Sequence, residues 1–177
     1  MNTLQELGHS VRQRRTDMAL TQSTLAQLSG LSRATINQIE SGAIRDLSLS
    51  RTARLLDVVG LTVQVSAARE RPALTARSGA PRSALALAAQ TASISFKAVL
   101  SEAQVRDAFC TGKVEPVFFP HVFILLDEAP VSLLARVVEE LHTQISVTHA
   151  AIWKTMRQLA HQLKSGRALW QIGRAHV

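Results

Sequence analysis

Hydrophobic residues recur at helical spacing from the very start of the chain. Leu4, Leu7, Val11 and Met18 follow this spacing while arginines lie to the side. Such a pattern is typical of an amphipathic helix, because residues three and four apart share one face. We therefore expect a first helix over residues 3–17.

Two short helices separated by a tight turn are predicted next. Thr21 can cap the first, which ends at Gly30, and Ser32 can cap the second, which ends at Gly42. Hydroxyl side chains accept backbone N–H groups at a helix start, and glycine takes the left-handed conformation at a helix end without steric penalty. Their apolar positions are Leu25, Leu28, Ile36 and Ile39. A short helix, a turn with glycine and a second helix with a polar outer face together form a helix-turn-helix arrangement.

A fourth helix and a short strand complete the expected first region. Leu49, Ala53 and Leu56 supply the inner face of that helix, which closes at Gly60. Residues 61–65 alternate apolar and polar side chains as a half-buried strand does; the apolar positions are Leu61, Val63 and Val65. Residues 93–98 alternate similarly, so the strand has two candidate partners, this segment or a second copy of the chain.

Residues 83–170 predict a small domain of three or four helices. Ser101 and Gln104 form a capping-box pattern that opens a helix ending near Gly112, Pro130 can begin another, and Thr148 can cap a last one. The apolar positions at helical spacing are Leu133, Leu134, Val137, Val138, Leu141, Ile152, Met156, Leu159, Ala160 and Leu163. A faint echo of the first region over residues 134–159 suggests a second, degenerate helix-turn-helix, but an ordinary helical hairpin explains it better.

Charge is concentrated in the first half of the chain. The sequence has 177 residues, a formal net charge of +7 and a pI near 11.0. Residues 1–82 hold eleven Arg against six Asp and Glu, a net charge of +5. Within them, 67–82 lose periodicity and collect prolines and four arginines, which predicts a basic linker. A basic balance permits an anionic partner, with nucleic acid first among the candidates.

Several broad classes of protein are not expected. The single cysteine, Cys110, excludes an internal disulfide framework and favours a reducing compartment. The N-terminus lacks the pattern of a secretory signal, and the longest apolar stretch, 117–126, is interrupted by Pro120 and His121. We expect a cytoplasmic protein without a membrane partner. Residues 171–177 read like translated sequencing adapter, with a native tail as the alternative, and 172–177 are set aside from the fold.

The sequence around the predicted turn resembles a known family. Leu-Thr-Gln at 20–22, Leu-Ala at 25–26, Ser-Gly-Leu-Ser-Arg at 29–33, Thr-Ile at 35–36 and Ile-Glu-Ser-Gly at 39–42 stand in the register of the lambda-repressor-like, or Xre-type, helix-turn-helix family. The resemblance covers about residues 4–66. It implies a mainly α protein with a four- or five-helix DNA-binding domain at 1–66, the short strand, the basic linker at 67–82 and a helical domain at 83–170.

The resemblance implies a double-stranded DNA partner and assigns roles to the polar residues. The outward positions of the third helix, which would face the bases, are Arg33, Ala34, Asn37 and Gln38. Arginine can bond guanine, and asparagine or glutamine can bond adenine, in bidentate fashion. Positions expected to meet phosphates are Gln22, Thr35, Ser41, Arg45 and Arg51. An ion pair between Arg15 and Glu40 is expected to tie the first helix to the end of the third.

Two further expectations follow from this family. Many relatives carry glycine where this chain has Ala19. If that position needs a positive φ, alanine is disfavoured there on steric grounds, so we expect the turn to differ slightly from the common form. Helix-turn-helix proteins commonly bind two half-sites as dimers. We expect a homodimer joined through residues 61–65, a placement similar to that in antitoxins of the HipB type.

The second region predicts protein contact rather than chemistry. Its histidines form no recognisable metal-ligand pattern, Cys110 is most simply a small apolar residue with a redox sensor as the alternative, and Asp127-Glu128 and Glu139-Glu140 resemble solvated helix faces. We expect no enzyme activity, metal or cofactor. The expected function is a transcriptional regulator, a repressor that occludes a promoter. The alternatives are an antitoxin that binds a toxin through 83–170, and a ligand-sensing or enzymatic second region.

Overall fold

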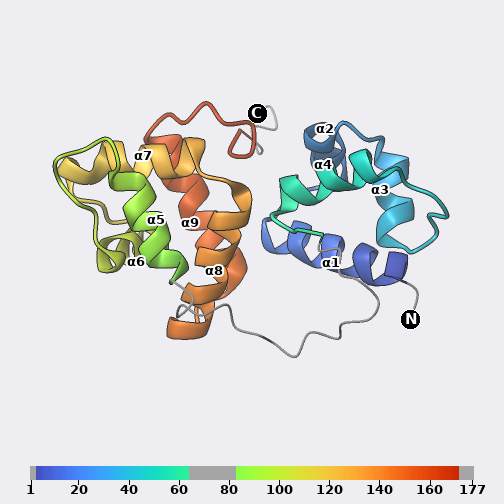
Figure 1. Ribbon diagram of the computed structural model, residues 1–177, viewed down its shortest axis with the longest axis horizontal. Helices are drawn as coiled ribbons and strands as arrows, with labels where there is room; N and C mark the ends of the chain where they lie inside the picture. Colours follow the sequence, from blue (N-terminus) through green and yellow to red (C-terminus); the bar gives the residue numbers. More distant parts are fainter. Residues whose placement is uncertain (1–2, 64–82, 172–177) are drawn as a thin grey trace, which may run out of the picture.

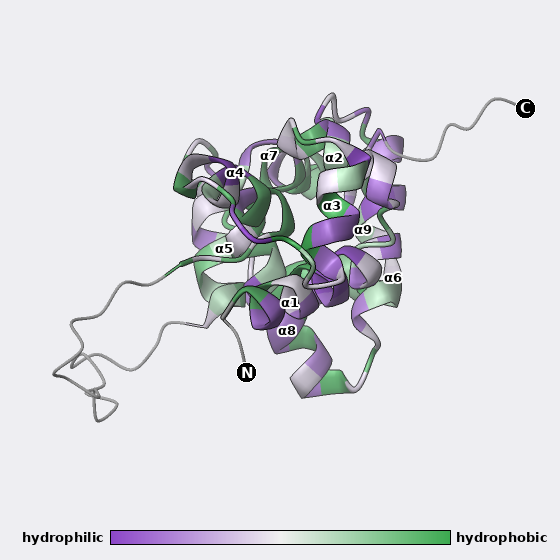
Figure 2. Ribbon diagram, turned by 90° about the vertical axis from the view of Figure 1, so that its right-hand side faces the viewer, coloured by the Kyte–Doolittle hydropathy of each residue, from purple (hydrophilic) through white to green (hydrophobic). Residues whose placement is uncertain are grey.

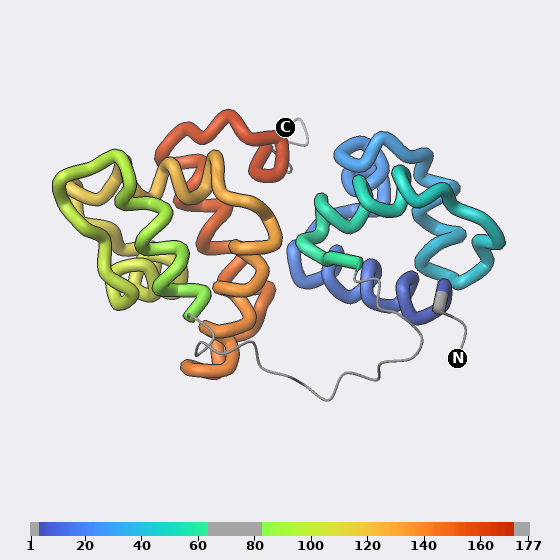
Figure 3. Tube along the Cα trace, in the orientation of Figure 1, coloured from blue at the N-terminus to red at the C-terminus, as the bar shows by residue number. Residues whose placement is uncertain are grey.

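The computed structural model describes residues 3–63 and 83–171 as two packed helical domains, which we call the head and the C-terminal domain (Figures 1 and 3). Within these residues the protein is mainly α-helical and has no strand. The expected linker over 67–82 and the last six residues lie outside the described residues, so the predicted domain boundaries at 66 and 82 stay predictions.

Four helices form the head, and they begin and end close to where the sequence predicts. They are α1 (Thr3–Asp17), α2 (Gln22–Ser29), α3 (Arg33–Glu40) and α4 (Leu49–Val59). Side chains from all four meet in one core, which includes Val11, Leu25, Ile36, Ile39 and Leu55, each fully buried. The head is therefore held together by its own hydrophobic interior.

The inner face of α4 differs from the prediction. Leu49 is 74% exposed and Ala53 is also exposed, whereas Leu55, Leu56 and Val59 are buried. Of the three predicted inner residues, only Leu56 is therefore confirmed. The sequence offers apolar residues on two sides of this helix, so spacing alone did not identify the buried stripe. The helix packs against α1 and α2 of the head and against α8 of the C-terminal domain.

The expected strand over 61–65 is not present at residues 61–63, which have no regular secondary structure. Leu61 is half-buried and Val63 is 53% exposed; Val65 lies outside the described residues. The intramolecular partner considered for this strand is also excluded as a strand, because Ser93 ends a helix and Ile94 to Ala98 form turns and bends. Pairing between two copies stays a prediction.

The C-terminal domain has five α-helices within the described residues, rather than three or four. They are α5 (Ala84–Ser93), α6 (Glu102–Thr111), α7 (Phe119–Glu128), α8 (Val131–Ile145) and α9 (His149–Gln162), with the 3-10 turn η1 (Pro116–Phe118) before α7. The predicted capping box of Ser101 and Gln104 and the cap at Thr148 are both present. The long helices α8 and α9 lie side by side as a hairpin (Figure 1).

Two of these helices were missed for identifiable reasons. The segment of α5 is rich in alanine and apolar on most sides, so it has no clear period, although alanine is the best helix former. Pro120 interrupts the apolar run of α7 in the sequence, but it occupies the first turn of that helix, where a missing N–H costs nothing.

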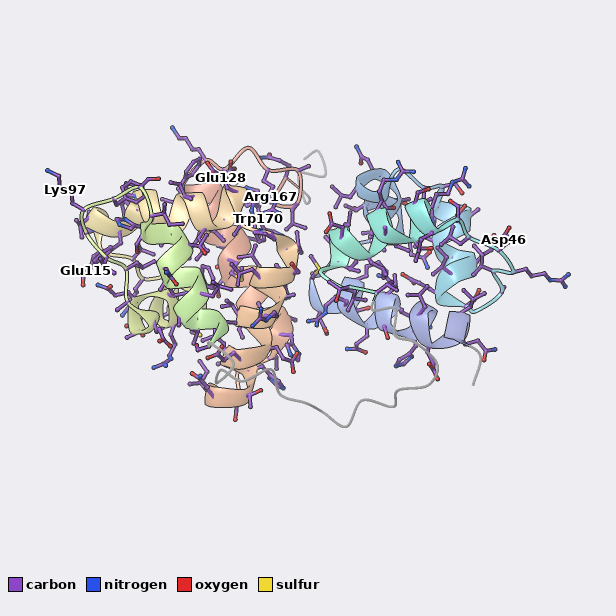
Figure 4. All side chains as sticks on the ribbon, viewed as in Figure 1. Asp46, Lys97, Glu115, Glu128, Arg167 and Trp170 are labelled. Carbon is purple, nitrogen blue, oxygen red and sulfur yellow. The ribbon has the colours of Figure 1, made fainter. Side chains whose placement is uncertain are left out.

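The chain after α9 returns across the C-terminal domain and completes its core. Trp170 is 1% exposed, and its indole N–H donates to the carbonyl of Leu126 at 2.8 Å. Arg167 donates to the carbonyl of Ala129 at 2.6 Å, next to the end of α7, and Figure 4 shows it beside Trp170.

No single helix in the described ranges is long and apolar enough to cross a bilayer, although the bent pair 102–111 and 116–128 passes that test when taken together.

Candidate nucleic-acid interface

The helix-turn-helix of the head is held by local hydrogen bonds at each end of its turn. The hydroxyl of Thr21 accepts the backbone N–H of Thr24 at 3.1 Å, and that of Ser32 accepts the N–H of Thr35 at 3.0 Å. Gly30 ends α2 in the left-handed conformation with a φ of 68°. These caps, all expected from the sequence, fix where α2 stops and where α3 begins.

The outer face of α3 is polar and open. Ile36 and Ile39 turn inward and are fully buried, whereas the four predicted base-facing residues are exposed: Arg33, Ala34, Asn37 and Gln38. In Figure 2, which views the molecule from the head side, hydrophilic segments are visible along α3. The C-terminal domain packs on the head through α1 and α4, so this face is left uncovered.

The residues predicted to meet phosphates differ in their exposure and in their hydrogen bonds. Ser41, Arg45 and Arg51 are exposed, and Thr35 is half-buried with its hydroxyl 2.8 Å from that of Ser32. Gln22 is half-buried at the start of α2 and donates through its amide to Glu40 at 3.0 Å. An amide nitrogen carries two N–H groups, so this bond leaves the side chain capable of donating to a phosphate as well.

The expected pair between Arg15 and Glu40 is present and is bidentate. The Nε of Arg15 lies 2.6 Å from one carboxylate oxygen of Glu40, and an Nη lies 2.9 Å from the other. A third nitrogen of Arg15 donates to the carbonyl of Leu20 at 2.9 Å. The pair therefore joins the end of α1, the α1–α2 turn and the end of α3.

Two opposing effects act on the pKa of the Glu40 carboxyl. Burial raises it, because a charge is less stable away from water, while hydrogen bonds from Arg15 and Gln22 and the charges of Arg15 and Arg12 lower it. The net result is a pKa below the ordinary value. Glu40 is thus held ionised at neutral pH as the acceptor for both partners.

The contact between α1 and α3 depends on a residue that sequence reasoning missed. A Cβ placed on Gly8 would lie 2.0 Å from the backbone oxygen of Ile39, well inside any allowed contact. Only glycine lets the two helices approach this closely. The available signal was a lone glycine inside an otherwise helical pattern, which usually has a packing reason.

Ala19 takes a backbone conformation that glycine adopts more readily than any other residue. Its φ is 52°, in the left-handed region that disfavours a side chain. The N–H of Leu20 bonds the carbonyl of Arg15 and that of Ala19 bonds the carbonyl of Thr16, which is a Schellman ending for α1. This position therefore has the positive φ at which the alanine was expected to be sterically disfavoured; that the turn differs from the common form of the family stays a prediction.

The C-terminal domain brings together some of the residues that the sequence singled out there. The rings of His142 and His149 lie 4.1 Å apart, and His149 contacts Glu139 at 3.1 Å. Among the described residues, no group of three or more side chains is arranged to hold a metal.

Cys110 is half-buried, and burial raises the pKa of its thiol.

A cavity in this domain was not expected from the sequence. It has a volume of about 580 Å³ and lies between α6 and the segment before α7. Leu100, Val114 and Phe118 form an apolar wall, and the side chains of Asp107 and Lys113 supply polar groups. Figure 4 shows Glu115, another lining residue, at the end of the molecule remote from the head.

The head has the fold and the exposed polar helix of a helix-turn-helix DNA-binding domain. Residues 6–69 match a family described as helix-turn-helix domain, which agrees with the resemblance to Xre-type proteins. No curated protein and no solved structure matches the chain. A domain of this class indicates a DNA-binding regulator.

Proposed function

We propose that the protein is a sequence-specific DNA-binding transcriptional regulator, and specifically a cytoplasmic repressor that occludes a promoter. The observation that carries this proposal is the outer face of α3, where Arg33, Asn37 and Gln38 are exposed on a helix whose other side is locked into the head core. A rigid helix with an open polar face fits the major groove of B-DNA.

The polar side chains of the head fall into two sets, one suited to reading bases and one suited to contacting phosphates. Arg33 suits the acceptor edge of guanine, and Asn37 or Gln38 suits adenine. Gln22 and Ser41 lie beside Asn37 on this face. Together with the exposed Arg45 and Arg51 they suit phosphates, which position a protein without reading sequence. The two sets together predict specific binding above a salt-dependent background.

A homodimer on a palindromic operator completes the proposal. One helix-turn-helix offers few base contacts, and a symmetric pair places two recognition helices about one helical turn apart. Residues 61–65 remain the proposed seam, supported by the exposure of Thr62 and Val63.

Selection of bound duplexes from a random DNA library tests this function. We expect enrichment of a symmetric motif whose half-sites are centred about ten base pairs apart. Enrichment of a single, unrepeated half-site would contradict the dimer, and recovery of sequences with no shared motif would contradict specific recognition.

Ligand sensing is a second candidate function, supported by the cavity beside α6. Its volume of about 580 Å³ falls in the range of small-molecule sites, and it combines an apolar wall with polar groups. Thr111→Trp would fill it from an exposed position. A small molecule that binds the protein but not this variant, and that changes DNA affinity, would support sensing; binding unaffected by the variant would contradict it.

An antitoxin role is a third candidate, supported by exposed apolar side chains of the C-terminal domain. Ile94 is 78%, Val99 73% and Val117 58% exposed, and Ile94 and Val99 line one shallow hollow. Exposed apolar side chains that lie together favour contact with another protein. Co-purification of a co-expressed neighbouring gene product would support this role, and recovery of the protein alone would contradict it.

A further inference from the structure

The two domains meet at the strained end of α1. Arg157 extends from α9 and donates through Nη2 to the carbonyl of Met18 at 2.6 Å, across 139 positions of sequence. Met18 directly precedes Ala19, the residue with a φ of 52°. The corner formed by residues 18–20 therefore combines an unfavourable backbone conformation with a charged hydrogen bond from the other domain.

The Arg157 guanidinium supplies a hydrogen-bond donor and a positive charge to the end of α1. Carbonyls in the last turn of a helix have no partner within the helix, and the helix dipole makes that end negative. A cation there donates a hydrogen bond to one carbonyl and interacts favourably with the negative end of the dipole. Burial lowers the pKa of Arg157, and within the described residues its Nε has no hydrogen-bond partner, so this side chain is held in place at a cost in hydration.

The same corner is connected to the recognition helix. Arg15 bonds the carbonyl of Leu20 at 2.9 Å and also bonds Glu40, the last residue of α3. Glu40 in turn accepts from Gln22 at the start of α2. A change in the backbone at residues 18–20 would thus be felt at both helices of the helix-turn-helix.

A second contact keeps the domains together independently of Arg157. A Cβ built on Gly60, at the end of α4, would lie 2.9 Å from the side chain of Ala135 and 3.0 Å from the carbonyl of Val131, both on α8. The head is therefore docked at the ends of α1 and α4, so Arg157 acts within an interface that has its own close packing.

We propose that Arg157 is a positioning residue for DNA binding, which holds the Met18–Leu20 corner in its strained form and so makes the geometry of α2 and α3 depend on the docked C-terminal domain. This inference rests on the proposed DNA-binding function. Arg157 itself lies away from the exposed face of α3 and acts through Met18, Leu20 and Arg15.

The test compares Arg157→Met with Lys154→Met in the full chain. Lys154 is an exposed cation on the same helix, so its replacement matches the loss of charge without touching the corner. We expect Arg157→Met to weaken binding to the selected duplex roughly five- to tenfold more than Lys154→Met does. It should also speed amide hydrogen exchange at Ala19 and Leu20, and Arg157→Lys should restore part of both effects.

Ala19→Gly separates positioning from a general loss of structure. Glycine adopts a positive φ freely, so the corner should no longer need the bond. In that background we expect Arg157→Met to change affinity by no more than about twofold, as the relief of strain predicts.

Three outcomes would decide the proposal. Unchanged exchange at Ala19 and Leu20 in Arg157→Met would overturn it, as would a loss of affinity that Ala19→Gly does not reduce. If exchange at Ala19 and Leu20 is faster in Arg157→Met but the wild type binds no duplex, Arg157 does fix the corner and the proposed DNA-binding function is wrong. The two failures are therefore distinguishable.

Discussion

Glu40 is the residue on which the geometry of the head depends most. Its side chain is 4% exposed, and its carboxylate accepts hydrogen bonds from Arg15 and Gln22, which come from two other helices. A buried pair of this kind fixes orientation more reliably than it adds stability, since desolvation offsets much of the attraction. Its loss, however, leaves the partly buried guanidinium of Arg15 without its carboxylate partner.

Glu40→Gln should therefore destabilise the head in a pH-dependent way. Because the folded-state pKa of Glu40 is lowered, the stability that its charge contributes is complete above the ordinary value of 4.5 and is lost as pH falls through the folded value. We expect the variant to be less stable by about 1–3 kcal/mol at pH 7, with a smaller deficit in acid. Urea unfolding at both pH values measures this.

Glu6→Gln is the matched control, because Glu6 is an exposed glutamate of the same domain. Its effect on stability should be within about 0.5 kcal/mol at pH 7. An equal deficit of Glu40→Gln at neutral and acid pH would show that the ionised carboxylate is not the source of its stabilisation.

Arg45→Ala should separate phosphate contact from base reading. Arg45 is exposed in the segment after α3. If it meets a phosphate, its loss weakens binding to the selected duplex and to unrelated duplexes alike, and reduces the slope of log affinity against log salt by about one. Titrations at several salt concentrations measure both quantities. A selective loss for the chosen duplex would place Arg45 among the base-reading residues instead.

Local signals at single residues predicted much of the head. The caps at Thr21 and Ser32 and the glycine at Gly30 act within one helical turn, so the sequence alone is enough to place them. The inward positions of α4 are different. Whether Leu49 or Leu55 is buried depends on what packs against the helix, and that partner is remote in sequence.

At the scale of elements, the approach of α1 to α3 sets where the recognition helix sits. The backbones touch at Gly8 and Ile39, and the Arg15–Glu40 pair adds a second contact about two helical turns further along α1. The C-terminal end of α3 is therefore held by α1 at two places, while the outer face of α3 stays polar.

Gly8→Ala should push these two helices apart. Alanine gains about 1 kcal/mol of helix propensity over glycine, but its Cβ would meet a backbone oxygen that cannot move aside. We expect a net destabilisation of about 1–3 kcal/mol, typical of overpacking. Circular dichroism during urea unfolding measures it.

Gly166→Ala provides the control, since a Cβ at Gly166 meets nothing within 4 Å. Trp153 and Trp170 both belong to the C-terminal domain, so their fluorescence should change less than the helical signal when Gly8 is replaced. Equal stability of the wild type and Gly8→Ala would contradict the close packing of α1 on α3.

At the scale of the whole molecule, the C-terminal domain covers the side of the head that does not carry the predicted DNA face. It packs on α1 and α4, while α3 and Asp46 lie at the opposite end in Figures 1 and 4. This arrangement leaves α3 free for a groove while giving the second domain a direct hold on the end of α1.

The contact between the two domains could not be predicted from the sequence. Arg157 and Met18 are 139 positions apart, and no sequence pattern at either residue indicates that it contacts the other. The cavity beside α6 was missed for the same reason, because it arises from packing between segments rather than from any local period. The helix α5 was missed because its alanine-rich segment has no clear period. The helix-turn-helix was predictable because its caps, turn and apolar positions lie within a few residues of one another.

We propose above all that α3 reads DNA sequence, and one measurement tests this proposal most directly. It is the ratio of affinities for the selected duplex and a base-scrambled duplex, compared between the wild type and an Arg33→Ala, Gln38→Ala variant at fixed salt. Each lost bidentate contact should reduce the difference in binding free energy between the two duplexes by about 1–3 kcal/mol, and salt-sensitive binding to both duplexes should remain. A variant that keeps the wild-type ratio would contradict the claim.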